Sequence, residues 1–275
     1  MLPGAGVEDF PVVPWDFCGG QRRRGRAQSL ALSIVISDCS TAAVPSNMAQ
    51  CGAIVFDMDG LMIDSEPLWH IAIAECFEKV SVALTHNDLL ETTGLRIDEV
   101  VEHNYQKHNW DESTLRTRSQ VTTDIVDTME RLLTEKAATI RKPGLDQALA
   151  FFKTKHLPMG LASSSPMRLI NAALKGLELQ DFFQVVVSAE GEKLGKPYPG
   201  VYLTAAAQLG VSADKCLALE DSLNGTLAAK AARMKCISIP EAETPSLGFH
   251  IADVQLKSLE EINQEMWTGL WGGEE

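Results

Sequence analysis

Two aspartates, Asp57 and Asp59, stand one residue apart directly after a short apolar run, and a second acidic pair, Glu220 and Asp221, follows another such run. Carboxylates that lie together repel one another unless a proton or a cation separates them. Oxygen ligands without His or Cys suit Mg²⁺, which keeps several waters and completes its shell with phosphate. If the fold brings the two runs side by side, these acids predict a magnesium site.

Polar groups suited to a phosphate follow in the same chain. Ser163, Ser164 and Ser165 end a second apolar run, and Lys196 precedes a proline in a loop. A serine at the start of a helix offers a hydroxyl and free backbone N–H groups to a phosphoryl oxygen. A lysine and a metal ion neutralise the charge that spreads over a phosphoryl group during its transfer. The pattern indicates phosphoryl-transfer chemistry on a small phosphorylated metabolite.

Each of these residues also has an ordinary structural explanation. The aspartates alone are typical of turns and helix caps, Ser163 is a normal N-cap residue, and a single lysine is usually solvated. What favours the chemical interpretation is that the groups all follow the ends of separate apolar runs.

Five short apolar runs predict buried strands, and they alternate with stretches of helical character. This alternation predicts an α/β fold with a doubly wound, Rossmann-like parallel sheet covered on both faces. Such sheets bind ligands at the carboxyl ends of their strands, so the acids, serines and lysine are expected to converge there. The predicted strands are 53–56, 159–162, 185–188, 217–219 and 236–239, and the predicted helices are 144–155, 167–177, 199–209 and 224–232.

The segment 67–140 interrupts the alternation. It has no convincing strand, and its apolar residues recur at helical spacing, which predicts an inserted all-helical cap domain. The core would then consist of 48–66 and 141–275. Because the insertion follows the first strand, we expect it to cover the ligand-binding edge of the sheet as a lid.

Composition narrows the class of protein. The chain has 275 residues, 45% of them apolar, which is ordinary for a globular protein. Its net charge of −13 disfavours a nucleic acid as a partner. The longest uncharged apolar stretch near the N-terminus, 27–37, is shorter than the roughly 20 residues that span a bilayer, so no membrane span is expected. Six scattered cysteines without zinc-site spacing predict reduced, mostly buried thiols and a cytoplasmic location. A monomer is expected.

Residues 1–47 differ in kind from the rest. They carry Gly, Pro and Ser, a basic cluster at 22–26 and an apolar run at 30–36. Acidic residues precede the basic cluster, so the match to a targeting peptide is poor. We predict a disordered or dispensable extension, with organelle targeting as the alternative, and Met48 as an alternative start.

Taken together, four motifs resemble the haloacid dehalogenase superfamily, and specifically its phosphatases with a helical cap after the first motif. These motifs are FDMDG at 56–60, LASSS at 161–165, KP at 196–197 and LEDS at 219–222. Three further stretches are similar to the bacterial hexitol-phosphate and 2-deoxyglucose-6-phosphate phosphatases: DSEPLW at 64–69, TGLRID at 93–98 and AKAARM at 229–234. The resemblance covers about residues 50–262.

The resemblance implies a role for each matching residue. Asp57 would be the nucleophile that takes the phosphoryl group as an aspartyl-phosphate. Asp59 would protonate the leaving alcohol and then activate water. Ser163, Ser164 and Lys196 would hold the phosphoryl oxygens.

The metal and cap residues follow from the same resemblance. Mg²⁺ would be bound by the Asp57 carboxylate, the Asp59 backbone carbonyl and Asp221, with Glu220 either supporting these ligands or replacing one. In the cap, Gly94 and Arg96 would lie in the loop that closes over the sugar, although an exposed arginine at a helix start explains Arg96 equally well.

The expected activity is a Mg²⁺-dependent phosphomonoesterase acting on small sugar or sugar-alcohol phosphates, such as 2-deoxyglucose 6-phosphate. One alternative is a phosphosugar mutase of the same fold, resembling β-phosphoglucomutase. Such mutases tend to carry a His twelve residues after the nucleophile, where this chain has Trp69, which is also expected to pack at the hinge between core and cap. The other alternative is a non-catalytic phosphate sensor, which the intact Asp57 and Asp59 disfavour.

Overall fold

The structure is a computed structural model, and it describes residues 50–136, 139–241 and 247–272. The extension predicted for residues 1–47 lies outside the described residues. Residues 47–275 belong to one compact unit.

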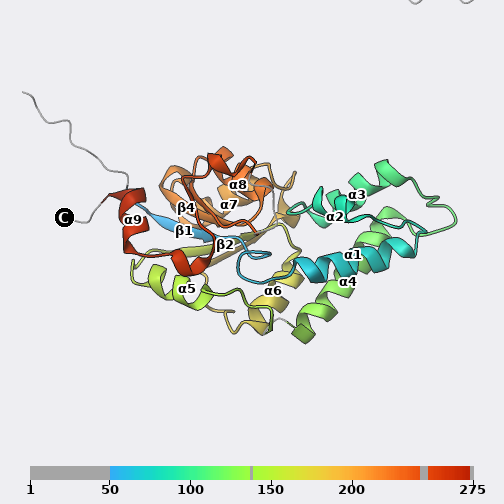
Figure 1. The fold of residues 1–275 in the computed structure, drawn as a ribbon, viewed down its shortest axis with the longest axis horizontal. Helices are drawn as coiled ribbons and strands as arrows, with labels where there is room; N and C mark the ends of the chain where they lie inside the picture. The colour runs from blue at the N-terminus through green and yellow to red at the C-terminus, as the bar shows by residue number, and fades with distance from the viewer. Residues whose placement is uncertain (1–49, 137–138, 242–246, 273–275) are drawn as a thin grey trace, which may run out of the picture. The chain divides into compact units, whose positions relative to one another are not determined.

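A parallel sheet of six strands organises the fold, in the order β3-β2-β1-β4-β5-β6 (Figure 1). The first five strands fall on the five predicted runs, which confirms the doubly wound α/β class. The sixth was not predicted, because two residues are too short for a periodic pattern. The strands are β1 (Ala53–Phe56), β2 (Met159–Ser163), β3 (Val185–Ser188), β4 (Cys216–Glu220), β5 (Lys235–Ser238) and β6 (Val254–Gln255).

Both faces of the sheet are buried, as continuous apolar strands require. Ile54 and Phe56 belong to one apolar cluster, whereas Ala53 and Val55 belong to the other, because successive side chains point to opposite faces. The first cluster includes residues of α5 (Leu145–Lys153), α6 (Met167–Gly176) and the C-terminal α9 (Gln264–Trp271); the second includes residues of α7 (Gly200–Leu209) and α8 (Leu223–Ala231).

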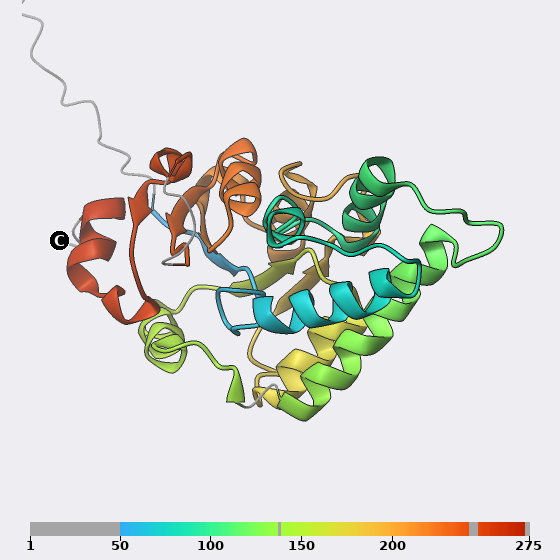
Figure 2. The ribbon, with the colours of Figure 1, turned by 45° about the vertical axis from the view of Figure 1, so that its right-hand side comes forward.

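The insertion between β1 and β2 is helical, as predicted, and lies beside the carboxyl ends of the strands (Figure 2). Its longest helix, α4, packs against α1 and α3 of the insertion and also against α6 of the core. Arg168 on α6 reinforces this contact by pairing with Asp127 and Glu130 on α4. The division into a cap at 67–140 and a two-part core stays a prediction. The inserted helices are α1 (Glu66–Glu78), α2 (His86–Leu90), α3 (Ile97–His108) and α4 (Arg118–Lys136).

Short 3₁₀ helices complete the described secondary structure. They are Ala189–Gly191, Ala213–Lys215, Phe249–Ile251 and Leu259–Glu261.

The two ends of the insertion are joined to each other by the backbone. Ile63 and Arg141 form an antiparallel bridge. The Asp64 N–H donates to the Ile140 carbonyl at 2.7 Å, and the Lys142 N–H donates to the Met62 carbonyl at 3.0 Å. We call this pairing of 62–64 with 140–142 the neck. It places the start of α1 close to the loop that follows β1.

Four cysteines, Cys51, Cys76, Cys216 and Cys236, are free and buried, as predicted. Burial raises the pKa of Cys51 to about 12 and that of Cys216 to about 11, which keeps both thiols protonated. Cys18 and Cys39 lie outside the described residues. Among the described helices, none is both long enough and apolar enough to cross a membrane.

Candidate active site

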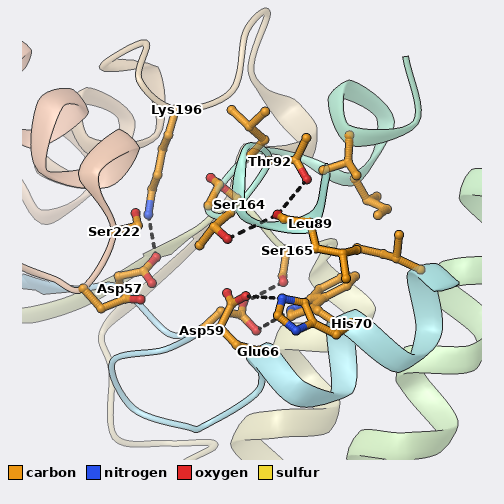
Figure 3. Close-up of a pocket in the computed structure, with 18 of the residues that line it drawn as sticks. Asp57, Asp59, Glu66, His70, Leu89, Thr92, Ser164, Ser165, Lys196 and Ser222 are labelled. Carbon is orange, nitrogen blue, oxygen red and sulfur yellow. Dashed lines mark hydrogen bonds and ion pairs between the residues drawn. The ribbon is translucent and has the colours of Figure 1, made fainter. Parts of the chain in front are cut away.

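A buried lysine links two strand ends at the carboxyl edge of the sheet. The Lys196 ammonium donates to the carboxylate of Asp57, which follows β1 (Figure 3). It also donates, at 2.6 Å, to the carboxylate of Glu220, the last residue of β4. Lys196, Asp57 and Glu220 are all buried. Because all three side chains are buried, the attraction between the two anions and the cation is stronger than it would be in solvent.

The pKa values of these groups reflect that burial. Burial alone would lower the pKa of Lys196, but the charges and hydrogen bonds of Asp57 and Glu220 raise it above its ordinary value. Burial, with the nearby charges of Glu220 and Asp59, raises the pKa of Asp57, and Lys196 only partly offsets this. One lysine is therefore not enough positive charge to offset the burial of Asp57 and its acidic neighbours.

Glu220 is saturated with hydrogen bonds. Its Oε1 accepts from Lys196 and from the Tyr202 hydroxyl, and its Oε2 accepts from the backbone N–H groups of Asp221 and Ser222 and from the Ser222 hydroxyl. This arrangement favours Glu220 as a support for Lys196, because few of its lone pairs are left for a cation.

Oxygen ligands suitable for a divalent cation lie beside this cluster. Carboxylate oxygens of Asp57, Glu220 and Asp221 lie within 4.8 Å of one another. Asp221 Oδ1 is buried and has no hydrogen-bond partner in the described structure. Burial and the charges of Asp57 and Glu220 raise the pKa of Asp221. The three acids face one lysine, so the residues fit a hard dication such as Mg²⁺.

The turn after β1 leaves room for the Asp221 carboxylate. Gly60 adopts a φ of +78°, and a Cβ at this position would lie 2.0 Å from Asp221 Oδ2. Glycine is therefore required here both by the left-handed backbone and by the close approach of the carboxylate.

Asp59 points away from Lys196, toward the cap. Its Oδ1 accepts from the Ser65 hydroxyl at 2.7 Å and the Trp69 indole N–H at 3.0 Å, and its Oδ2 accepts from the Ser165 hydroxyl at 2.7 Å and from Ser163 at 3.3 Å. Ser65 is the N-cap residue of α1 and makes no side-chain cap; its hydroxyl donates to Asp59. The start of α1 and the loop after β2 thus meet on one carboxylate.

The three serines after β2 take different positions. A pocket lies between Asp57, Asp59 and the inserted helices (Figure 3). Ser163 is fully buried and does not line this pocket, whereas Ser164 and Ser165 do. The Ser164 hydroxyl donates to the Gly94 carbonyl at 3.0 Å, which ties the core to the cap loop. The contacts with phosphate that the sequence predicts for Ser163 and Ser164 stay predictions.

The two predicted cap residues lie in different places, one in the pocket and one outside it. Gly94 lines the pocket with a φ of +79°, and a Cβ there would meet Ser222 Oγ at 2.8 Å. The Arg96 guanidinium instead binds Asp98 and the backbone carbonyls of Ala189 and Glu192, outside that pocket. Arg96 thus joins the start of α3 to the segment after β3, and its predicted contact with the sugar stays a prediction.

Sequence reasoning missed three side chains of the site. Glu66 and His70 on α1 line the pocket beside Asp59, and the buried Tyr202 on α7 supports Glu220. An acidic residue at a helix start is common, and a tyrosine in an apolar helix is typical of a core, so neither pattern stood out. The signal available for Glu66 and His70 was their i, i+4 spacing on a helix that starts at the site.

A doubly wound parallel sheet whose strand ends carry a carboxylate and lysine cluster beside a helical insertion defines the class of protein, an α/β domain with its site at the carboxyl edge of the sheet. Residues 54–239 match the sequence profile of the haloacid dehalogenase-like hydrolases, and the chain belongs to this family.

Known relatives agree with this assignment. The chain is 41% identical over 226 residues to hexitol phosphatase B of Escherichia coli strain K12, which covers 82% of this chain and all of that protein. It is 31% identical over 192 residues to a phosphorylated carbohydrates phosphatase of Thermotoga maritima, covering 67% of this chain and 83% of the relative. Its fold superposes on CbbY from Rhodobacter sphaeroides, crystallised in complex with phosphate, with a TM-score of 0.69 and 26% identity, covering 77% of this chain and 96% of CbbY.

Proposed function

We propose that this enzyme is a Mg²⁺-dependent phosphomonoesterase that hydrolyses small sugar or sugar-alcohol phosphates. The observation that carries the proposal is the buried Asp57, Lys196 and Glu220 cluster beside an unpartnered oxygen of Asp221, at the base of a pocket roofed by the cap. An acidic cluster of this kind needs a cation, and a phosphate ester brings oxygens that complete the shell of Mg²⁺.

Asp57 acts as the nucleophile. One of its oxygens forms a bond to phosphorus while the bond from phosphorus to the alcohol oxygen breaks, and Asp59 gives its proton to that alcohol. Asp59 then takes a proton from a water that attacks the aspartyl-phosphate, which frees Asp57 and releases phosphate. To reach the alcohol, Asp59 must give up part of its hydrogen bonding to Ser65, Trp69 and Ser165.

The groups around Asp57 make this transfer electrostatically feasible. Mg²⁺, held by the carboxylates of Asp57 and Asp221 and the backbone carbonyl of Asp59, would neutralise charge on the phosphoryl oxygens. Lys196 keeps its ammonium against Asp57 and is positioned by Glu220. Glu220 serves as that support, in line with its saturated oxygens.

Sugar and sugar-alcohol monophosphates are the substrates that the relatives' names suggest, with hexitol phosphates and 2-deoxyglucose 6-phosphate as the first to test. Hydrolysis is favoured over a mutase reaction because the position twelve residues after Asp57 holds Trp69, whose indole can only donate a hydrogen bond. The presence of both Asp57 and Asp59 disfavours a non-catalytic sensor.

The test is phosphate release from a panel of hexose and hexitol phosphates, with Mg²⁺ and with EDTA. We expect release that needs the metal, that Asp57→Asn reduces by orders of magnitude, and that the exposed control Asp181→Asn leaves unchanged. Retained turnover in Asp57→Asn would contradict the covalent mechanism. Conversion of glucose 1-phosphate to its 6-phosphate without release of phosphate would establish the mutase instead.

A further inference from the structure

Helix α1 and the segment after α2 contribute five polar side chains to the pocket, and three of them are already hydrogen-bonded within the protein. The Trp69 indole donates to Asp59, and the Thr92 and Thr93 hydroxyls donate to the Leu89 carbonyl at 3.1 and 3.5 Å. The remaining two are Glu66 and His70.

Glu66 and His70 retain their hydrogen-bonding capacity. Within the described part of the chain, His70 Nε2 is buried without a hydrogen-bond partner, and the Glu66 carboxylate, whose side chain is 22% exposed, accepts no hydrogen bond. The two lie on one face of α1, with Glu66 Oε2 3.8 Å from His70 Nε2, which is too long for a hydrogen bond. Figure 3 shows both beside Asp59.

Buried polar groups without partners are costly unless a ligand satisfies them. A carboxylate accepts hydrogen bonds from hydroxyl groups, and a neutral imidazole can donate one and accept another. Burial and the neighbouring His86 lower the pKa of His70, which favours the neutral ring. The pair therefore matches a ligand with several hydroxyl groups.

The rest of the pocket wall limits the charge of that ligand. Its only Lys or Arg side chain, among the residues the structure describes, is Lys196, which already pairs with Asp57 and Glu220. A second phosphate or a carboxylate on the leaving group would face Glu66 without a compensating cation. The cap side of the wall is otherwise apolar and accommodates a carbon chain: Ile73, Leu89, Leu95, Ile97 and Val100.

We infer that Glu66 and His70 form the hydroxyl-recognising part of the substrate pocket and select monophosphates of uncharged polyols and sugars over phosphate esters with an acidic leaving group. This inference rests on the proposed function and extends it to the residues that choose the leaving group.

The test compares kcat/KM for three esters: sorbitol 6-phosphate, which has hydroxyl groups on the leaving group; p-nitrophenyl phosphate, which has none; and phosphoglycolate, which has a carboxylate. Burial and the charge of Asp59 raise the pKa of Glu66 to about 7, so the comparison is made at about pH 8.5, where Glu66 is ionised. We expect Glu66→Gln to lower the ratio of sorbitol 6-phosphate to p-nitrophenyl phosphate by about tenfold, because a hydrogen bond to a charged acceptor is replaced by one to a neutral acceptor. The ratio of phosphoglycolate to p-nitrophenyl phosphate should rise, because the repelling charge is gone.

Two further variants separate recognition from folding. His70→Ala should also lower the sorbitol 6-phosphate ratio, and Glu75→Gln, an exposed change on the same helix, should leave both ratios unchanged. Equal losses of kcat/KM on all three esters in Glu66→Gln and His70→Ala would overturn this inference and leave the proposed function standing. If the wild-type enzyme released phosphate from none of the esters, the proposed function would fail, and the inference with it.

Discussion

Lys196 shows how a single residue can connect stability to chemistry. Its ammonium is buried between two carboxylates and would be costly to place there without them. The same contact lowers the negative charge next to Asp57, the proposed nucleophile. The residue that stabilises this edge of the sheet is therefore also the one that makes a negatively charged phosphate approachable.

Replacing Lys196 by Met is expected to damage both properties. Removing one partner of a buried ion pair leaves the other charge uncompensated, so we expect a loss of about 3–5 kcal/mol in the free energy of unfolding. Phosphate release should fall below detection in the variant even where it is folded. Urea denaturation and phosphate assays would measure the two effects, with the exposed Lys193→Met as the matched control. A fully active Lys196→Met enzyme would remove the lysine from the proposed mechanism.

At the scale of the element, α2 is a helix of five residues that depends on its cap. The Thr85 hydroxyl accepts from the Asp88 N–H, and the Asp88 carboxylate accepts from the Thr85 N–H at 2.7 Å, which forms a capping box. Lys107 on α3 adds an ion pair with Asp88 at 2.6 Å. This small network fixes the helix immediately before the cap loop that carries Gly94.

Asp88→Asn should reveal this network through its pH dependence. Hydrogen bonds from Lys107 and Thr85 hold the pKa of Asp88 well below its usual range. The carboxylate therefore stabilises the folded state fully above the unfolded pKa of about 4, and that contribution is lost as the pH falls toward the folded pKa. We expect the variant to be about 1–3 kcal/mol less stable at pH 7.

The difference between wild type and Asp88→Asn should stay constant from pH 7 to about 5 and shrink as the pH is lowered further to about 3, as measured by denaturation at each pH. Asp181→Asn, whose side chain is exposed, should show no such trend. A difference in stability that stays constant with pH would assign the effect to packing and not to the charge of Asp88.

At the scale of the molecule, the sequence predicts the sheet well because each strand is a short apolar run between polar turns. The same logic located Asp57, Lys196 and Asp221, since parallel strands bring their carboxyl ends together. It could not show that Arg96 turns toward the carbonyls of Ala189 and Glu192, because that depends on how the cap docks. Nor could it find β6, because its two residues form no periodic pattern and are recognised as a strand only by their pairing with β5.

The described fold also predicts the effect of removing residues 1–47. In the part of the chain that the structure describes, both apolar clusters, the neck and the proposed site residues lie between residues 51 and 271. We expect the shortened chain to keep its activity and to melt within about 2 °C of the full chain, which for a domain of this size corresponds to less than about 1 kcal/mol. Thermal melting and phosphate release would check this. An insoluble or inactive product would show that the extension belongs to the fold.

The neck has a consequence for how such a protein can change over time. Its pairing between 62–64 and 140–142 is made by backbone groups, which every residue except proline carries, so it does not depend on the sequence of the helices between these points. Mutations that reshape α1 to α4 can therefore alter leaving-group preference while Asp57, Lys196 and Asp221, which lie outside those helices, stay as they are. Selection can thus act on the pocket residues of the inserted helices separately from the proposed phosphoryl-transfer residues.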